Sequence, residues 1–201
     1  MGEYILTDTP EPTARETLAS CDHRDALTAI LRLFDHAVSS RARTLAMHFE
    51  VRAPESVPHG KCRQALDCFL DTFISALKRE GHRPLYAWSR TRSGGDSYRP
   101  GFGLILLLDA SKADSVANQL RNAEGAWALA LGIDDASGFV GYYDRDEHGD
   151  QLGNGILLHG DAPGIAPDWC ECYRWAKQLA EHAGDRSAPV GLPRWGCSRT
   201  D

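Results

Sequence analysis

Residues 85–108 read LYAWSRTRSGGDSYRPGFGLILLL, and this stretch decides the fold. Over Leu85–Thr91 two sets of side chains alternate with a period of two, which predicts a strand. Ser93–Asp96 is rich in glycine and predicts a turn or short loop. Gly101–Leu108 is a continuous apolar run, short enough for a central strand that is covered on both faces. The stretch therefore predicts two consecutive strands.

Further helices and strands are expected on both sides of this pair. Apolar residues at helical spacing predict helices over residues 22–40, 61–80, 112–131 and 167–183, and strands are expected over 44–51, 139–143 and 156–159. Asp22 or Asp25 is expected to cap the first helix, and Ser111 the third. Residues 1–20 are expected to be a loose tail, 144–154 a long hairpin loop and 185–201 a loop.

The order of these elements contains the series β-α-β-β-α-β, which is the ferredoxin-like arrangement. It predicts an α+β fold in which helices pack on one face of an antiparallel sheet. We expect residues 1–40 to form an N-terminal tail and accessory helix, and residues 41–201 to form the main domain.

Composition excludes several classes of protein. The chain has 201 residues, 42% of them hydrophobic and 25% charged, which is typical of a folded domain and not of a disordered chain or coiled coil. No apolar run approaches the roughly 20 residues of a membrane span, and the first ten residues do not resemble a secretory signal. None of the six cysteines forms a CxxC pair, so we expect reduced thiols, no cysteine metal site and a cytoplasmic location.

The net charge of −6 hides an uneven distribution. Residues 78–99 contain six basic and two acidic residues, and residues 174–199 contain five basic and two acidic ones. Residues 125–173 contain nine acidic residues and one basic residue. One surface is thus able to attract phosphate while another repels it, or these charges form ordinary solvated surfaces; the sequence leaves both interpretations open.

Three stretches in order carry a family resemblance: residues 85–108, Cys172–Lys177 (CYRWAK) and Arg194–Arg199 (RWGCSR). Together they resemble the replication proteins of filamentous phages (inoviruses) and their prophage relatives, which are similar to HUH endonucleases. The resemblance runs from about residue 44 to residue 199. It implies a phage protein with an HUH/Rep-like fold, related to the initiation of rolling-circle replication.

The resemblance also implies where catalytic groups would lie. Family members hold a divalent cation with two histidines and one acidic residue, and a helical tyrosine attacks the phosphate. Tyr173 and Lys177 fall at the tyrosine and lysine positions. The three ligand positions fall on Thr91, Gly101 and Gly103, which cannot hold the ion. We therefore expect a catalytically degenerate protein that needs no cofactor, with Mg²⁺ or Mn²⁺ required only if nicking is retained.

Aromatic and basic residues are interleaved, a pattern typical of proteins that bind single strands. The stacking candidates include Tyr86 and Trp88, whose alternative role is to pack beneath a helix. The residues predicted to bind nucleic acid are Arg83, Trp88, Arg90, Arg92, Arg99, Arg174, Arg194 and Arg199. The predicted partner is single-stranded DNA or a host protein, with no membrane, and the oligomeric state is left open.

Two alternative functions remain at this point. In the first, the protein inhibits a host defence protein, as anti-CRISPR proteins do, and the acidic residues of 134–171 mimic DNA. Alternatively it is an active single-strand nickase that uses Tyr173 and recruits ligands such as His48 and nearby carboxylates. The acidic segment Asp144–Asp150 offers possible metal ligands but lacks the glycine and glutamate of a calcium loop in register, so we expect a solvated acidic tip there.

Overall fold

The fold was described from a computed structural model, which covers residues 14–92, 100–113, 115–143, 149, 155–160, 167–183 and 194–200. Its elements are α1 (Ala14–Ser40), β1 (Arg43–Arg52), α2 (His59–Arg79), β2 (Leu85–Arg92), β3 (Pro100–Asp109), α3 (Val116–Leu131), β4 (Val140–Tyr142), β5 (Ile156–His159), α4 (Pro167–Ala183) and β6 (Trp195–Cys197). No helix within these ranges is long and apolar enough to cross a membrane.

The six strands form one antiparallel sheet in the order β4-β1-β3-β2-β6, and β5 pairs with the other end of β1. Strands β1 to β4 thus have the 4-1-3-2 order of a ferredoxin-like fold, so the predicted fold class is confirmed. The two strands predicted from residues 85–108 pair along their whole length, from Leu85 opposite Leu107 to Arg92 opposite Pro100.

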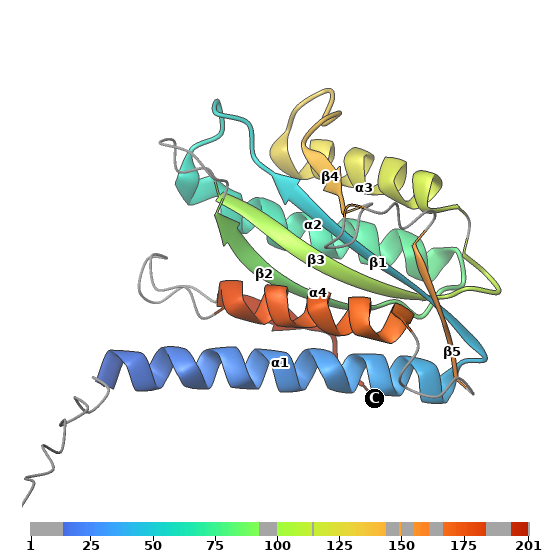
Figure 1. Cartoon of the computed structure of the whole chain (residues 1–201). Helices are drawn as coiled ribbons and strands as arrows, with labels where there is room; N and C mark the ends of the chain where they lie inside the picture. Colours follow the sequence, from blue (N-terminus) through green and yellow to red (C-terminus); the bar gives the residue numbers. More distant parts are fainter. Residues whose placement is uncertain are drawn as a thin grey trace, which may run out of the picture.

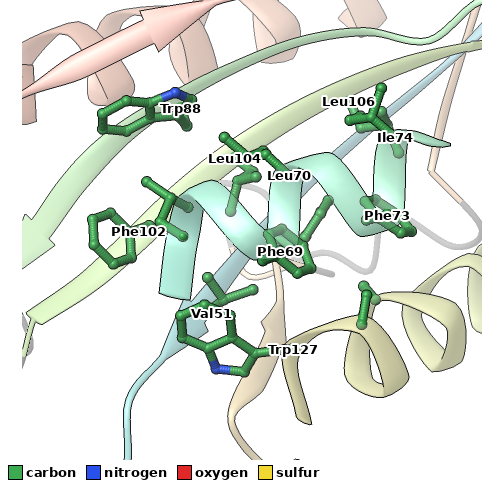
Figure 2. Close-up of a cluster of buried hydrophobic side chains, with 14 of the residues drawn as sticks. Val51, Phe69, Leu70, Phe73, Ile74, Trp88, Phe102, Leu104, Leu106 and Trp127 are labelled. Atoms are coloured by element: carbon green, nitrogen blue, oxygen red, sulfur yellow. The ribbon is translucent and has the colours of Figure 1, made fainter. Parts of the chain in front are cut away.

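One face of the sheet is covered by α2 and α3 and is apolar (Figure 1). Alternate residues of β1, β2 and β3 point toward these helices. The apolar residues that recur with a period of two in the sequence therefore form one buried layer. Figure 2 shows its centre, where Phe69 of α2 meets Trp127 of α3 edge-on at 5.6 Å between ring centroids. The other labelled residues in this layer are Val51, Leu70, Phe73, Ile74, Trp88, Phe102, Leu104 and Leu106.

The opposite face is covered by α1 and α4, which lie against each other (Figure 1). The expectation that helices pack on one face only was therefore wrong. Both extra helices carry an apolar stripe, with Ile30 and Phe34 on α1 and Trp175 and Leu179 on α4, and each stripe needs a partner surface. The second face of the sheet provides that surface.

Three predicted boundaries were wrong. The first helix begins at Ala14 rather than Asp22, so neither Asp22 nor Asp25 caps it. The cap of α3 is Ser115, whose side chain accepts a hydrogen bond from the Asn118 amide. The C-terminal segment is not only a loop, because β6 pairs with residues 87–89 of β2.

The strands β4 and β5 do not form the predicted hairpin. Both pair antiparallel with the same edge of β1: β4 lies opposite residues 49–51, and β5 lies opposite residues 43–46. They run in the same direction, one after the other, as two halves of one interrupted edge strand. Residues 144–148 and 150–154, within the predicted loop, lie outside the described residues.

Candidate functional site

A group of polar side chains lies on the α1/α4 face of the sheet. His48 and Glu50 of β1 and Ser89 and Thr91 of β2 are at most 5% exposed. They occupy the positions that alternate with the apolar residues facing α2 and α3. We call these four residues the polar patch. Gly101 and Gly103 of β3 lie between them, because Gly103 pairs with Glu50 and Ser89, and Gly101 with Thr91.

The space above these two glycines is filled by neighbouring side chains. A Cβ atom at Gly101 would lie 2.5 Å from both Glu50 Oε1 and Thr91 Oγ1. A Cβ atom at Gly103 would lie 3.0 Å from Leu179 Cδ1 of α4 and 3.2 Å from Thr91 Cγ2. Any larger residue at Gly101 would have to displace a hydrogen-bonded pair. The resemblance places the family's two histidines at these positions, and the structure provides no room for them.

Both carboxylate oxygens of Glu50 are engaged. Thr91 Oγ1 donates a hydrogen bond to Oε1, and Arg52 Nε donates to Oε2 at 2.9 Å. The Arg52 side chain is half exposed, whereas that of Glu50 is nearly buried. The guanidinium therefore compensates the buried charge from the edge of the patch, as a buried carboxylate requires.

His48 is held between aromatic rings. Its imidazole stacks on Tyr143 at 4.1 Å between centroids, and Trp175 of α4 lies 5.5 Å away. Burial, with smaller contributions from Arg174 and His182, lowers the pKa of His48 from 6.5 to about 3. Among the described atoms Nδ1 has no hydrogen-bond partner. His48 is therefore a neutral, packed side chain at pH 7.

These residues do not fit the divalent cation that the resemblance implies. Thr91, Gly101 and Gly103 supply no imidazole or carboxylate, and Glu50 already accepts two hydrogen bonds. No group of three His, Cys, Asp or Glu side chains able to hold a metal ion exists among the described residues. His48 and Glu50 share a strand face as possible recruited ligands, yet the described part of the chain gives them no third partner.

Tyr173 and Lys177 lie on the outer side of α4. The residues of this helix that pack inward are Cys172, Trp175, Ala176, Leu179, Ala180 and Ala183. The Tyr173 side chain is 50% exposed, and Lys177 lies 3.9 Å from Glu181 in an exposed ion pair. The helix thus presents Trp175 and Leu179, not the two predicted catalytic side chains, to the sheet.

The residues predicted to bind nucleic acid differ in exposure and surroundings where the structure describes them. Trp88 is 5% exposed and packs beneath α2, with the Arg63 guanidinium 4.7 Å from its ring, so its packing role is the one observed. Arg174 bonds Glu171 on the same helix. Arg90 and Arg194 are partly buried, and the side chains of Arg92 and Arg99 lie outside the described structure.

Arg83 and Arg199, in contrast, lie together in an open cleft of about 820 Å³. It is located where α1 and α2 end and β2 begins. The described residues that line it include five cationic side chains and one carboxylate, that of Asp109. We call this site the cationic cleft, and its cations are Arg41, Lys78, Arg83, Lys112 and Arg199.

The cationic cleft was only partly predicted. Arg41, Lys78 and Lys112 were not singled out as binding residues, because they belong to separate segments that only the fold brings together. Arg41 is held in place by its own hydrogen bonds, which it donates to the carbonyl oxygens of Leu107 and Arg83. Burial lowers the pKa of Arg41, and Asp109 partly offsets this effect.

The acidic surface predicted over residues 134–171 is described only in part. Asp134, Asp135 and Asp168 are exposed, and Glu171 is paired with Arg174. Hydrogen bonds from Ser137 lower the pKa of Asp135. The remaining acidic residues of this stretch, including the candidate metal site of Asp144–Asp150, lie outside the described residues.

Comparison with known proteins gives one structural neighbour and no sequence relative. The chain matches no protein-family model and no curated protein. It is similar in structure to the catalytic domain of the Adeno Associated Virus type 5 Rep protein, with 11% identity and a TM-score of 0.38. The similarity covers 68% of this chain and 97% of that domain. A likeness at this level does not assign the chain to a family or an activity.

Proposed function

We propose that this chain is a Rep-like protein that binds nucleic acid and has lost metal-dependent nicking. The observation that carries the proposal is the closed packing above Gly101 and Gly103. The positions where an initiator of the resembled family would present histidines are occupied by the Glu50–Thr91 hydrogen bond and by Leu179.

The loss of chemistry follows from the energetics of phosphoryl transfer. A cation neutralises the charge that develops on the phosphate, and losing even one such contact typically raises the barrier by about 3 kcal/mol. The patch instead contains Glu50, whose carboxylate is already bonded to Arg52 and Thr91 and gives a phosphate no stabilising cation. Without such a cation, the hydroxyl of Tyr173, on the outer side of α4, has no polarised phosphate to attack.

Retained binding is supported by the distribution of charge. The chain is acidic overall, with a net charge of −6, yet five cations gather around one open cleft. Such local excess of positive charge attracts a polyanion even when the whole protein is negative.

A plasmid assay tests the loss of nicking. Supercoiled DNA incubated with the full chain and Mg²⁺ or Mn²⁺ is expected to stay supercoiled, for wild type and for Tyr173→Phe alike. Binding is measured separately with a labelled single-stranded oligonucleotide, and detectable affinity is expected. Nicking that disappears in Tyr173→Phe would overturn the proposal and favour an active nickase. A failure to bind any single strand would overturn the binding part.

A further inference from the structure

A second, smaller hollow adjoins the cationic cleft. It has a volume of about 330 Å³ and is lined by the aromatic residues Tyr86 and Trp88 of β2 and by the strand β6. We call it the aromatic pocket. Tyr86 lines both hollows, and their other walls are successive turns of α2, with Asp71 in the pocket and Ile74 in the cleft. The two hollows are therefore neighbouring parts of one groove along α2.

The C-terminal segment forms the outer wall of this groove. Ser198 donates its amide to the Tyr86 carbonyl at 2.8 Å and accepts the Tyr86 amide on its Oγ at 3.0 Å. Gly196 permits this close approach, because a Cβ atom there would lie 2.8 Å from Trp88 Nε1. The segment thereby holds Gly196 at the aromatic pocket and Arg199 in the cationic cleft, while Trp195 packs on the opposite face of the sheet against Ala26, Ala180 and Ala183.

The two ends of the groove differ in charge. The described lining of the cleft has five cations and one carboxylate, whereas that of the pocket has two carboxylates, Asp67 and Asp71, and Arg63, which is bonded to Asp67. Phosphate is attracted to the first end and disfavoured at the second. A planar aromatic group suits the junction of the two ends, because the Tyr86 ring there is only partly buried.

The cleft also contains a buried histidine that is not satisfied within the protein. His82 is 5% exposed, and its Nδ1 has no hydrogen-bond partner among the described atoms. Buried polar atoms normally have a partner, so an orphaned one at the wall of a charged cleft is consistent with a ligand site.

We propose that this groove binds single-stranded nucleic acid, with backbone phosphates in the cationic cleft and one base against Tyr86, the ring that the cleft shares with the aromatic pocket. The inference rests on the proposed function and assigns it a location. The groove lies along α2 and the β6 edge of the sheet, apart from the polar patch beneath α4. Binding therefore does not depend on the degenerate positions.

The test compares two triple variants with the same change in net charge. Lys78→Glu, Arg83→Glu and Arg199→Glu reverse three exposed cations of the cleft. The control, Arg24→Glu, Lys61→Glu and Arg121→Glu, reverses three exposed cations that do not line it. Anisotropy of a labelled single-stranded DNA is measured over a range of salt concentrations, and circular dichroism verifies folding.

We expect the cleft variant to bind at least about tenfold more weakly than the control, and its salt slope to fall by about 2, because each phosphate contact contributes roughly 0.7 for single strands. Tyr86→Ala is expected to weaken binding roughly five- to hundredfold, and Tyr86→Phe to retain most of the affinity.

Each of the other outcomes would overturn a defined part of the proposal. If wild type binds and the two triple variants bind alike, the groove is not the binding site, and the proposed function stands. If wild type binds no single strand, both fail. If polyglutamate displaces the labelled DNA as well as unlabelled single-stranded DNA does at equal charge concentration, the cleft binds negative charge without selecting nucleic acid. An acidic protein is then the better partner. If Tyr86→Ala binds like wild type, the stacking contact is wrong.

Discussion

The two faces of the sheet are packed in different ways. Toward α2 and α3, the strands present an apolar layer centred on Phe69, Trp127 and their neighbours. Toward α4, the same strands present His48, Glu50, Ser89 and Thr91, with two glycines between them. Buried polar groups cost free energy unless they are hydrogen-bonded, so the second face is the less stable solution. The difference is local, because the rest of the second face is an apolar layer that includes Ile30, Phe34 and Trp175.

Adding a side chain at Gly101, on the polar face, should have the largest effect. Gly101→His is expected to lower the free energy of unfolding by about 3 kcal/mol, because its Cβ atom meets Glu50 and Thr91 at 2.5 Å. The matched control is Gly125→His in α3, where nothing lies within 4 Å of an added Cβ atom. Urea denaturation measures both. Equal stability of the two variants would show that the patch opens easily.

Acid should weaken the polar face through His48. Burial holds the pKa of folded His48 at about 3, below its ordinary value of 6.5. Between these values the unfolded chain binds a proton that the folded chain does not, so stability is complete above pH 6.5 and falls as the pH is lowered. At about 1.4 kcal/mol per pH unit, the loss from pH 6.5 to 4.5 is about 2–3 kcal/mol.

His48→Gln isolates this contribution, because glutamine does not titrate. Denaturation at pH 6.5 and 4.5 is expected to show a smaller loss of stability in the variant than in wild type. The same loss in both proteins would mean that His48 is protonated in the folded chain, and the patch would then be open to water.

Two buried tryptophans allow a direct comparison of the faces. Trp127 Nε1 donates to the Arg52 carbonyl at 2.7 Å, whereas Trp175 Nε1 has no partner among the described atoms. Both rings are fully buried. Trp127→Phe is therefore expected to cost about 1 kcal/mol more than Trp175→Phe, since only the first loses a hydrogen bond. Thermal and urea unfolding of the pair tests this, and the reverse order would contradict it.

The smallest effect is expected outside both faces. Tyr173→Phe removes a hydroxyl from a half-exposed side chain, and the free energy of unfolding should change by less than about 0.5 kcal/mol. A larger loss in urea unfolding would mean that the hydroxyl has a structural partner.

The sequence predicted the centre of the fold better than its outer parts. Alternation along residues 44–51 and 85–91 was sufficient for the central strands, because a period of two has one simple structural solution. The beginning of α1 lacks such a period, and β6 is only three residues long, so neither gave a local signal. The second helical face was missed for a related reason: an apolar stripe shows that a helix is buried, not which surface buries it.

The candidate site, too, was predictable from the sequence only in part. Motif positions placed Thr91, Gly101 and Gly103 in one site, and the pairing of β2 with β3 places Thr91 opposite Gly101 and Ser89 opposite Gly103. The filling of that space by Glu50 and Leu179 was not predictable, because both come from other elements. The cationic cleft was harder still, since Arg41, Lys78 and Lys112 meet only after the chain has folded.

The short strands at both margins of the sheet bear on self-association. The long strands β1 and β3 are interior, whereas β4, β5 and β6 have three, four and three residues. Beyond β6, residues of the C-terminal segment continue to bond β2, through Arg90 with Arg194 and Tyr86 with Ser198. A neighbouring copy therefore meets only brief stretches of unpaired backbone in the described margins, which disfavours strand-to-strand aggregation.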